Sequence, residues 1–321
     1  TYVEQKRHME RDWKPFHKLP VQDIDRRAVA ARLQVLAVKP GPIAANRARA
    51  TLSAFYGWAI GQGIADVNPV VGTVPPGKET AGDRTLSAAE VRAVWQAAGD
   101  NEFGRIVKLL LLTGQRRGEV AGIVWDELDL DKAIWSLPPA RTKNGLPHDV
   151  PLSRQAVAIL AAVPQREQPA QDGQPAETRP LLFGRGEGPF SGWSKPRERL
   201  NAKIARQRAA ARLGRPLAAD EAPEPRDALA GWTLHDLRRT VVTGMNELGI
   251  QPHIVEAVVN HISGRARAGV AGVYNRATYA TEKRVALQAW ADHLDQVLGL
   301  GPRTVIPMRA HAGPSAASAH A

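Results

Sequence analysis

FGRIVKLLLLTGQRRGE, residues 103–119, combines an apolar helical run with a basic interruption. The apolar periodicity predicts a helix that begins near residue 103 and stops at Gly114, and a second short helix follows. Arg116 lies in the interruption, where its guanidinium and nearby free N–H groups can bind a phosphate oxygen. An exposed basic loop gives the same pattern, which fits Arg117. Glu119 is a candidate for the buried partner of an arginine or of a neighbouring helix.

Helical patterns flank this segment on both sides. Ser87 is followed three residues later by Glu90, a capping box that marks the start of a helix. Helical periodicity returns at Thr233 and continues, with breaks, to about Leu298. The chain after residue 85 is therefore expected to be mainly helical.

Two short strands interrupt the helical pattern. Residues 133–137, AIWSL, and 148–152, HDVPL, have the composition of strands, and Asn144-Gly145 between them is a strong hairpin signal. Lys143 is therefore expected beside a β-turn at the tip of a hairpin. A lone lysine there is ordinarily a solvent-exposed surface residue, and the position also suits a mobile proton donor.

The chain divides into segments of different character. Residues 1–74 have helical periodicity with proline and glycine breaks, which predicts a small bundle of about four helices. Residues 75–84 are rich in turn-forming residues and are interpreted as a linker. A second domain is expected over 85–300, and residues 301–321, which lack periodicity, are expected to be a mobile tail. A length of 321 residues also agrees with two domains.

The composition favours a polyanionic partner. Lys and Arg number 43 against 32 Asp and Glu, so the net charge is +11 and the pI is about 10.2. The absence of cysteine excludes disulfides, Cys-ligated metal sites and a thiol nucleophile. No apolar run reaches the roughly 18 residues that span a bilayer, and the first residues lack a signal-peptide core. A soluble intracellular protein is expected.

Residues 185–215 form the most basic stretch, with nine Lys and Arg against two acidic residues. They lie between segments 164–180 and 214–230, whose proline and polar content predicts surface loops. The basic stretch is a candidate contact surface for a polyanionic partner.

Four further residues are weak candidates for a functional site when each is taken alone. His235 and Arg238 are three residues apart, so on a helix they share one face and can converge on one anion. A solvated charged face gives the same pattern. His261 follows the predicted helix 252–259. Tyr274 lies in an apolar stretch, where a tyrosine is usually a core residue.

Taken together and in order, these residues resemble the site of the tyrosine recombinase (phage integrase) family, in particular the integrases of prophages and genomic islands. The matching positions are Arg116, Lys143, His235, Arg238, His261 and Tyr274. The resemblance covers nearly the whole chain, and Tyr274-Asn-Arg followed by residues 282–284, Glu-Lys-Arg, adds to it. Two positions depart from the family pattern. Asn260 precedes His261 where the family often has Gly, and Gly118 stands where Ser is frequent.

The resemblance implies a mainly α fold, with an N-terminal helical core-binding bundle and a mainly helical catalytic domain that carries a small antiparallel β-sheet. It implies a site-specific DNA recombinase that integrates or excises a mobile element through a 3′-phosphotyrosyl intermediate. Two alternatives stay open at this point. One is a DNA-binding accessory factor that has lost turnover, and the other is a topoisomerase-like enzyme that relaxes DNA.

The resemblance also implies the tasks of the matching residues. Arg116 and Arg238 would bind the nonbridging phosphate oxygens, and His261 would hydrogen-bond the same phosphate.

The remaining three residues would move protons and bonds. Tyr274 would attack phosphorus, His235 would accept the phenolic proton, and Lys143 would protonate the departing 5′-oxygen. Tyr279 lies five residues further on, about 500° around a helix, so it is expected to pack or to contact the DNA backbone.

Neither a cofactor nor a metal ion is implied. The implied partners are double-stranded DNA and three further copies of the chain, in a homo-tetramer on paired DNA sites, with accessory DNA-bending proteins as additional candidates. No membrane partner is expected, and the implied location is the cytoplasm, in association with the nucleoid.

Overall fold

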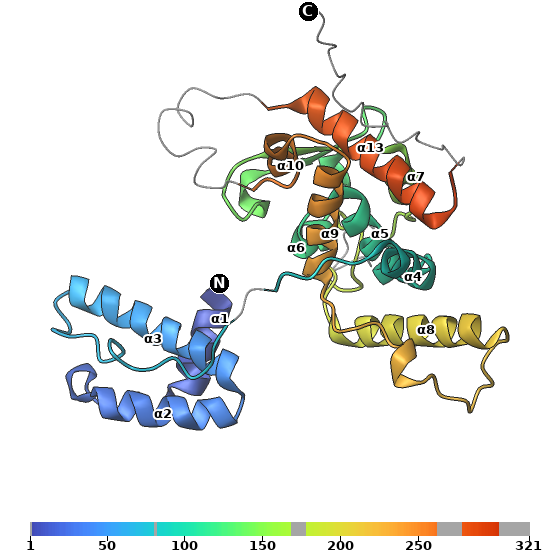
Figure 1. Cartoon of the computed structure of the whole chain (residues 1–321). Coiled ribbons are helices and arrows are strands. Elements are labelled where there is room, and N and C mark those ends of the chain that lie inside the picture. The colour runs from blue at the N-terminus through green and yellow to red at the C-terminus, as the bar shows by residue number, and fades with distance from the viewer. Residues whose placement is uncertain (1, 80–81, 168–177, 262–277, 302–321) are drawn as a thin grey trace, which may run out of the picture. The chain divides into compact units, whose positions relative to one another are not determined.

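Residues 2–79, 82–167, 178–261 and 278–301 are described in the computed structural model, in which the chain divides into two units after Gly82 (Figure 1). Each unit has its own cluster of buried apolar side chains. The predicted fold class is confirmed, because helices dominate and the described strands form one small antiparallel sheet.

The first unit contains two long helices and several short turns. Its helices are α1 (Tyr2–Arg7), α2 (Arg26–Val38) and α3 (Pro42–Gly61). The Asp25 side chain accepts a hydrogen bond from the Ala28 N–H at the start of α2, and α3 begins with a proline at its first position. The indole of Trp13 donates to the Ala48 carbonyl and anchors α3 in the core.

About four helices were predicted in this unit, but three α-helices form among its described residues, and shorter turns occupy the stretch between α1 and α2. Residues 8–12 form a π-helical turn, and residues 14–16 and 21–23 form 3-10 turns. Pro15 and Pro20 have no backbone N–H to donate, which limits regular helix in this stretch.

Part of the predicted linker packs against the first unit. The Asn46 side chain in α3 donates to the Gly77 carbonyl at 2.7 Å, and the Arg47 guanidinium bonds to the Glu79 carboxylate at 2.9 Å. These contacts hold residues 77–79 against α3.

The second unit is built from helices that match most of the expected positions. They are α4 (Ala88–Ala98), α5 (Glu102–Thr113), α6 (Arg117–Ala121), α7 (Arg154–Ala161), α8 (Ser194–Leu213), α9 (Leu234–Glu247), α10 (Pro252–Val258) and α13 (Ala280–Leu298). The Ser87–Glu90 capping box is present at the start of α4, as predicted. Among the described residues, no helix combines the length and the apolar content needed to cross a membrane.

Helix α5 lies at the centre of the second core. Its side chains are almost all buried, and it packs against α4, α7, α9 and α13 (Figure 1). The indole of Trp290 in α13 donates to the Leu111 carbonyl at 2.7 Å. A Cβ at Gly244 in α9 would come within 2.2 Å of the Trp290 ring, so the close approach of α9 and α13 requires glycine there. These contacts fix α9, which carries His235 and Arg238.

The sheet has the order β1-β2-β3, with β1 (Leu128–Asp129), β2 (Ile134–Leu137) and β3 (His148–Pro151) all antiparallel. Ile134 pairs with Pro151 and Leu137 with His148. The predicted strand pair is therefore present, but its connection is longer than a two-residue turn and runs over 138–147. Pro138 and Pro139 lack the N–H groups that would extend the ladder. Lys143 does lie beside a turn, in which the Gly145 N–H donates to the Thr142 carbonyl at 3.3 Å.

Candidate active site

The C-terminal end of α10 binds both predicted arginines. One terminal nitrogen of Arg238 donates to the Val259 carbonyl at 2.5 Å, and one of Arg116 donates to the Asn260 carbonyl at 3.3 Å. Carbonyls at a helix end have no partner within the helix and carry partial negative charge, so they suit guanidinium donors. Residues more than 100 positions apart in the sequence thereby meet at one helix end.

The preceding carbonyl of the same helix end anchors two more side chains. The Gln115 amide donates to the Val258 carbonyl at 2.8 Å, and the His148 Nε2–H donates to it at 3.0 Å. Burial lowers the pKa of His148 to about 4, so its ring is neutral at pH 7. Gln115 and His148 were missed in the sequence, because no local pattern marks a side chain whose partner is a distant carbonyl.

Arg116 lies at the start of α6 and is paired with Glu119. The Glu119 carboxylate accepts from the Arg116 backbone N–H and from its guanidinium, both at 2.8 Å. Glu119 is 5% exposed, which confirms the prediction that it is a buried partner of an arginine. The Arg116 side chain itself stays 24% exposed, so part of its guanidinium remains accessible.

Arg238 is more deeply placed, at 8% exposure. Its second terminal nitrogen donates to the Gly114 carbonyl at 2.8 Å. Gly114 is left-handed, with φ +64°, and a Cβ there would lie 3.0 Å from Val241, so the helix end that holds Arg238 requires glycine. Burial and the charge of Arg116 lower the pKa of Arg238 to about 10, at which it remains protonated at neutral pH.

His235 lies in the first turn of α9, one helical turn before Arg238, and its side chain is exposed. Thr233 and Asp236 form the capping box that starts this helix. Partial burial, and the positive charges of Arg239 and Arg238, lower the pKa of His235 below its ordinary value. A neutral imidazole at pH 7 is able to accept a proton.

Lys143 is exposed in the connection between β2 and β3, and within the described part of the chain its ammonium has no hydrogen-bond or ion-pair partner. Its neighbours are held on both sides. Arg141 bonds to the Glu127 carboxylate and donates to the Glu119 carbonyl at 2.7 Å, and the Asn144 amide donates to the Asn260 side chain at 2.8 Å.

Four of the six predicted residues line one cavity of about 540 Å³, namely Arg116, Lys143, His235 and Arg238. Arg117, Trp193 and Arg197 line it as well. The Arg117 guanidinium stacks over the Trp193 ring at 4.8 Å. An exposed Arg117 agrees with the sequence analysis, but its aromatic partner was not anticipated, because α8 begins far from it in the sequence.

The two remaining predicted residues are not seen at this cavity in the described part of the chain. His261 is exposed, does not line the cavity, and donates its backbone N–H to the Glu256 carbonyl at 2.9 Å. Tyr274 lies outside the described residues. Tyr279 precedes α13, is half-buried, and its ring contacts that of His253 edge-on with centroids 5.3 Å apart.

The basic stretch divides into two halves with different contacts. Arginines in the C-terminal half of α8, and Arg215 just beyond it, hold the loop 214–230. Arg206 donates to three carbonyls of the loop, and Arg208 donates to the Ala228 carbonyl. Arg212 bonds to the Asp227 carboxylate, and Arg215 bonds to the Glu221 carboxylate. Five other basic side chains have no such partner among the described residues: Arg185, Lys195, Arg197, Arg199 and Lys203.

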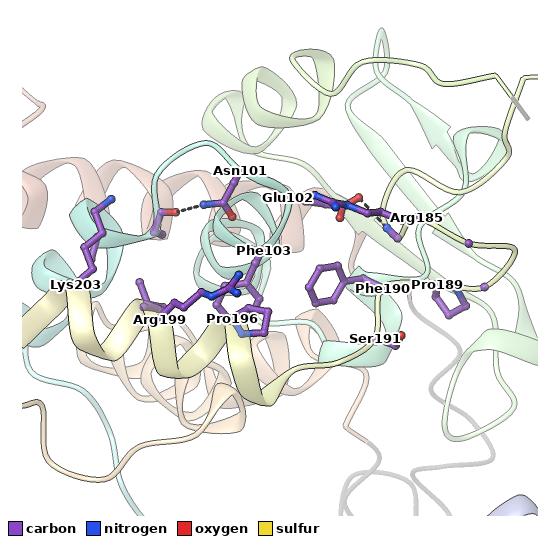
Figure 2. A pocket seen from close by; sticks show the side chains of 16 residues that line it. Asn101, Glu102, Phe103, Arg185, Pro189, Phe190, Ser191, Pro196, Arg199 and Lys203 are labelled. Atoms are coloured by element: carbon purple, nitrogen blue, oxygen red, sulfur yellow. Dashed lines mark hydrogen bonds between the residues drawn. The ribbon is translucent and has the colours of Figure 1, made fainter.

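A second cavity, of about 750 Å³, lies beside the N-terminal half of α8. Figure 2 shows Arg199 and Lys203 extending from α8 on one side, with Arg185 and Phe190 on the loop opposite. Glu102 also lines this cavity, and its carboxylate accepts from the Gly184 N–H at 2.8 Å. Three of these cations in α8 therefore line a cavity: Arg197 lines the first, and Arg199 and Lys203 line the second.

Residues 85–279 match the phage integrase family. The prophage integrase IntZ of Escherichia coli (strain K12) is 29% identical over 306 residues, which are 93% of this chain and 67% of that protein. The prophage integrase IntA of the same strain is 32% identical over 183 residues, which are 57% of this chain and 36% of that protein. A lambda integrase tetramer bound to a Holliday junction shares the fold, with a TM-score of 0.51 and 19% identity over 81% of this chain and 71% of that chain.

Proposed function

The chain belongs to the phage integrase family, and on that premise we propose that it is a tyrosine site-specific recombinase, which cuts and rejoins DNA to integrate or excise a mobile element. The observation that carries the proposal is the cavity lined jointly by Arg116, Lys143, His235 and Arg238. These side chains come from three separate elements, and their chemistry matches the needs of a phosphoryl transfer.

The two arginines would stabilise the negative charge that develops on the phosphate. Each uses two of its five N–H groups for the contacts described above, so further donors remain for nonbridging oxygens. Because carbonyls and Glu119 already fix both guanidinium groups, little reorganisation is needed during the reaction.

The cleavage step has a complete proton balance. The Tyr274 oxygen forms a bond to phosphorus, and its proton passes to the neutral His235. The bond from phosphorus to the 5′-oxygen breaks, and Lys143 donates a proton to that oxygen. The product is a 3′-phosphotyrosyl linkage and a free 5′-hydroxyl. A 5′-hydroxyl from another strand can then attack the linkage and reverse the step without an external energy source.

We assign the first unit to DNA binding, as a core-binding domain, and the second to catalysis as well as DNA binding. Both carry net positive charge: residues 1–82 contain twelve Lys and Arg against seven Asp and Glu. The partner-free cations of α8 add candidate phosphate contacts beside the site.

Exchange between two duplexes needs four cleavages, so a homo-tetramer on paired DNA sites is the proposed assembly. The lambda integrase with the same fold is a tetramer on a Holliday junction. Accessory DNA-bending proteins are further candidate partners, and the substrate places the protein in the cytoplasm, at the nucleoid.

Covalent trapping tests the proposal. A pool of nicked duplexes with randomised sequence loses the short 5′-hydroxyl fragment on cleavage, so a cleaving enzyme stays attached. We expect a covalent adduct that mass spectrometry locates at Tyr274. Tyr274→Phe should abolish the adduct while DNA binding stays within a few-fold, and the matched variant Tyr279→Phe should still form it.

Three other outcomes would contradict the proposed nucleophile or favour a different function. An adduct in Tyr274→Phe would contradict the assignment of the nucleophile. DNA binding by the unaltered protein without any adduct would favour an accessory factor. Relaxation of supercoiled plasmid without joining of two recovered sites would favour a topoisomerase-like enzyme.

A further inference from the structure

Asn260 occupies a backbone position that usually requires glycine. It has φ +48°, and the His261 N–H donates to the Glu256 carbonyl at 2.9 Å while the Asn260 N–H donates to the Ala257 carbonyl at 3.4 Å. This pattern is a Schellman motif, in which the left-handed residue after the helix is most often Gly and sometimes Asn. Asparagine therefore keeps the helix end that binds the arginines and adds a side chain there.

That added side chain has a specific partner. The Asn144 amide nitrogen donates to the Asn260 side-chain oxygen at 2.8 Å, and the Asn260 amide nitrogen donates back to Asn144 at 3.4 Å. Both residues are half-buried. The pair joins the connection between β2 and β3 to the end of α10, which lies 116 positions away in the sequence.

The connection has few other fixed points near Lys143. Arg141 holds it on one side through Glu119 and Glu127, and β3 begins on the other side at His148. Between these points, the Asn144–Asn260 pair is the tertiary side-chain contact closest in sequence to Lys143. The Asn260 carbonyl also accepts from Arg116, so the same residue contacts the phosphate-binding side and the lysine side of the cavity.

We propose that Asn144 and Asn260 are positioning residues that hold the backbone beside Lys143 in place, so that the Lys143 ammonium stays within reach of the phosphate bound by Arg116 and Arg238. This inference rests on the proposed function, because the benefit of fixing Lys143 is the protonation of the leaving 5′-oxygen. A displaced proton donor slows the reaction even when substrate binding is unchanged.

The first test needs no DNA. Asn260→Gly removes the side-chain amide but introduces glycine, the residue that this helix end favours. The melting temperature should therefore change by no more than about 2 °C. Hydrogen exchange of residues 139–147 should become roughly threefold faster or more, while exchange in α10 stays unchanged. The control Asn246→Ala removes an exposed amide in α9 and should leave residues 139–147 unchanged. Unaltered exchange of 139–147 in Asn260→Gly would overturn the proposal, whether or not the protein cleaves DNA.

The second test measures cleavage of the duplex recovered by covalent trapping. Asn260→Gly should bind this duplex normally and form the adduct about tenfold more slowly. The defect should disappear when the bridging 5′-oxygen is replaced by sulfur, because a thiolate leaves without a proton. A purely structural role would slow both substrates equally, and that result would contradict the positioning role.

A double-substitution cycle tests whether Asn144 and Asn260 act as a pair or independently. Asn144→Ala should produce the same sulfur-dependent recovery, and Asn144→Ala combined with Asn260→Gly should be no slower than the slower single variant. Multiplied defects in the double variant would show that the two amides act independently and would also contradict the proposal. Failure of the unaltered protein to cleave either substrate would instead refute the proposed function.

Discussion

At the scale of single residues, burial and neighbouring charges together set the charge state of His235. Partial burial disfavours the imidazolium form most strongly, and the charges of Arg239 and Arg238 in the same helix, and of Arg116 just before α6, act in the same direction. Asp236 opposes them, but its carboxylate is already bound to Thr233 and Arg239. The neutral ring is thus favoured where a proton acceptor is needed.

Removal of one positive charge should move the His235 titration in a known direction. Arg239→Gln removes a like charge and frees Asp236, and both changes favour the imidazolium, so the pKa of His235 should rise. The acidic limb of adduct formation should then move to higher pH. The ring resonance of His235 in an NMR titration measures the shift directly. Arg239→Lys keeps the charge and should leave the midpoint close to that of the unaltered protein, whereas a downward shift in Arg239→Gln would contradict the electrostatic explanation.

At the scale of elements, helix α8 shows that a basic stretch can serve two purposes. Its buried side chains, Leu200 and Ile204, pack against the core, and its C-terminal arginines bind the loop 214–230. The N-terminal half keeps its cations accessible beside both cavities. Net charge counts these residues alike, but we expect those without an internal partner to contribute most to DNA binding.

Two double variants, each of which removes two positive charges from α8, test whether its two halves differ in DNA binding. The double variant Arg199→Gln with Lys203→Gln should bind DNA with a shallower salt dependence. The slope of the log binding constant against log salt should shrink in magnitude by up to about 2, because each lost phosphate contact removes roughly 0.9. Arg208→Gln with Arg212→Gln removes the same charge and should leave the slope nearly unchanged while protease cleavage in 214–230 becomes faster. Equal slopes for the two double variants would refute the division.

At the scale of the whole molecule, the two units have separate cores and each has a net positive charge. The first unit includes residues beyond the predicted boundary at 74, since Gly77 and Glu79 bond to α3. Arg49 in α3 also bonds to Thr73.

Fragments of the chain should therefore differ in folding and in DNA binding. Residues 1–82 should unfold cooperatively, and a fragment that ends at Gly72 should melt at a lower temperature because it lacks the contacts of Arg49 and Asn46. The full chain should bind DNA with a steeper salt dependence than residues 1–82, because both units neutralise phosphates. Calorimetry and salt titrations measure these differences, and identical slopes for fragment and full chain would contradict DNA binding by the second unit.

The sequence by itself determined the features whose physical cause is local. The Ser87–Glu90 capping box, the end of α5 at Gly114 and the start of α9 at Thr233 each depend on residues within a few positions. The composition that marks β2 and β3 is local as well. Family order added the six candidate residues, four of which line one cavity.

Only the tertiary structure decided what holds those residues in place. Arg238 and Arg116 bond to carbonyls at the end of α10, and Asn144 bonds to Asn260, across separations of 21, 144 and 116 positions. A backbone carbonyl is present at every position, so no side-chain pattern in the sequence reveals which one will lie opposite a guanidinium. That choice depends on how α9 packs against α5 and how α10 packs against α9 and α13, which is fixed by long-range burial rather than by neighbouring residues.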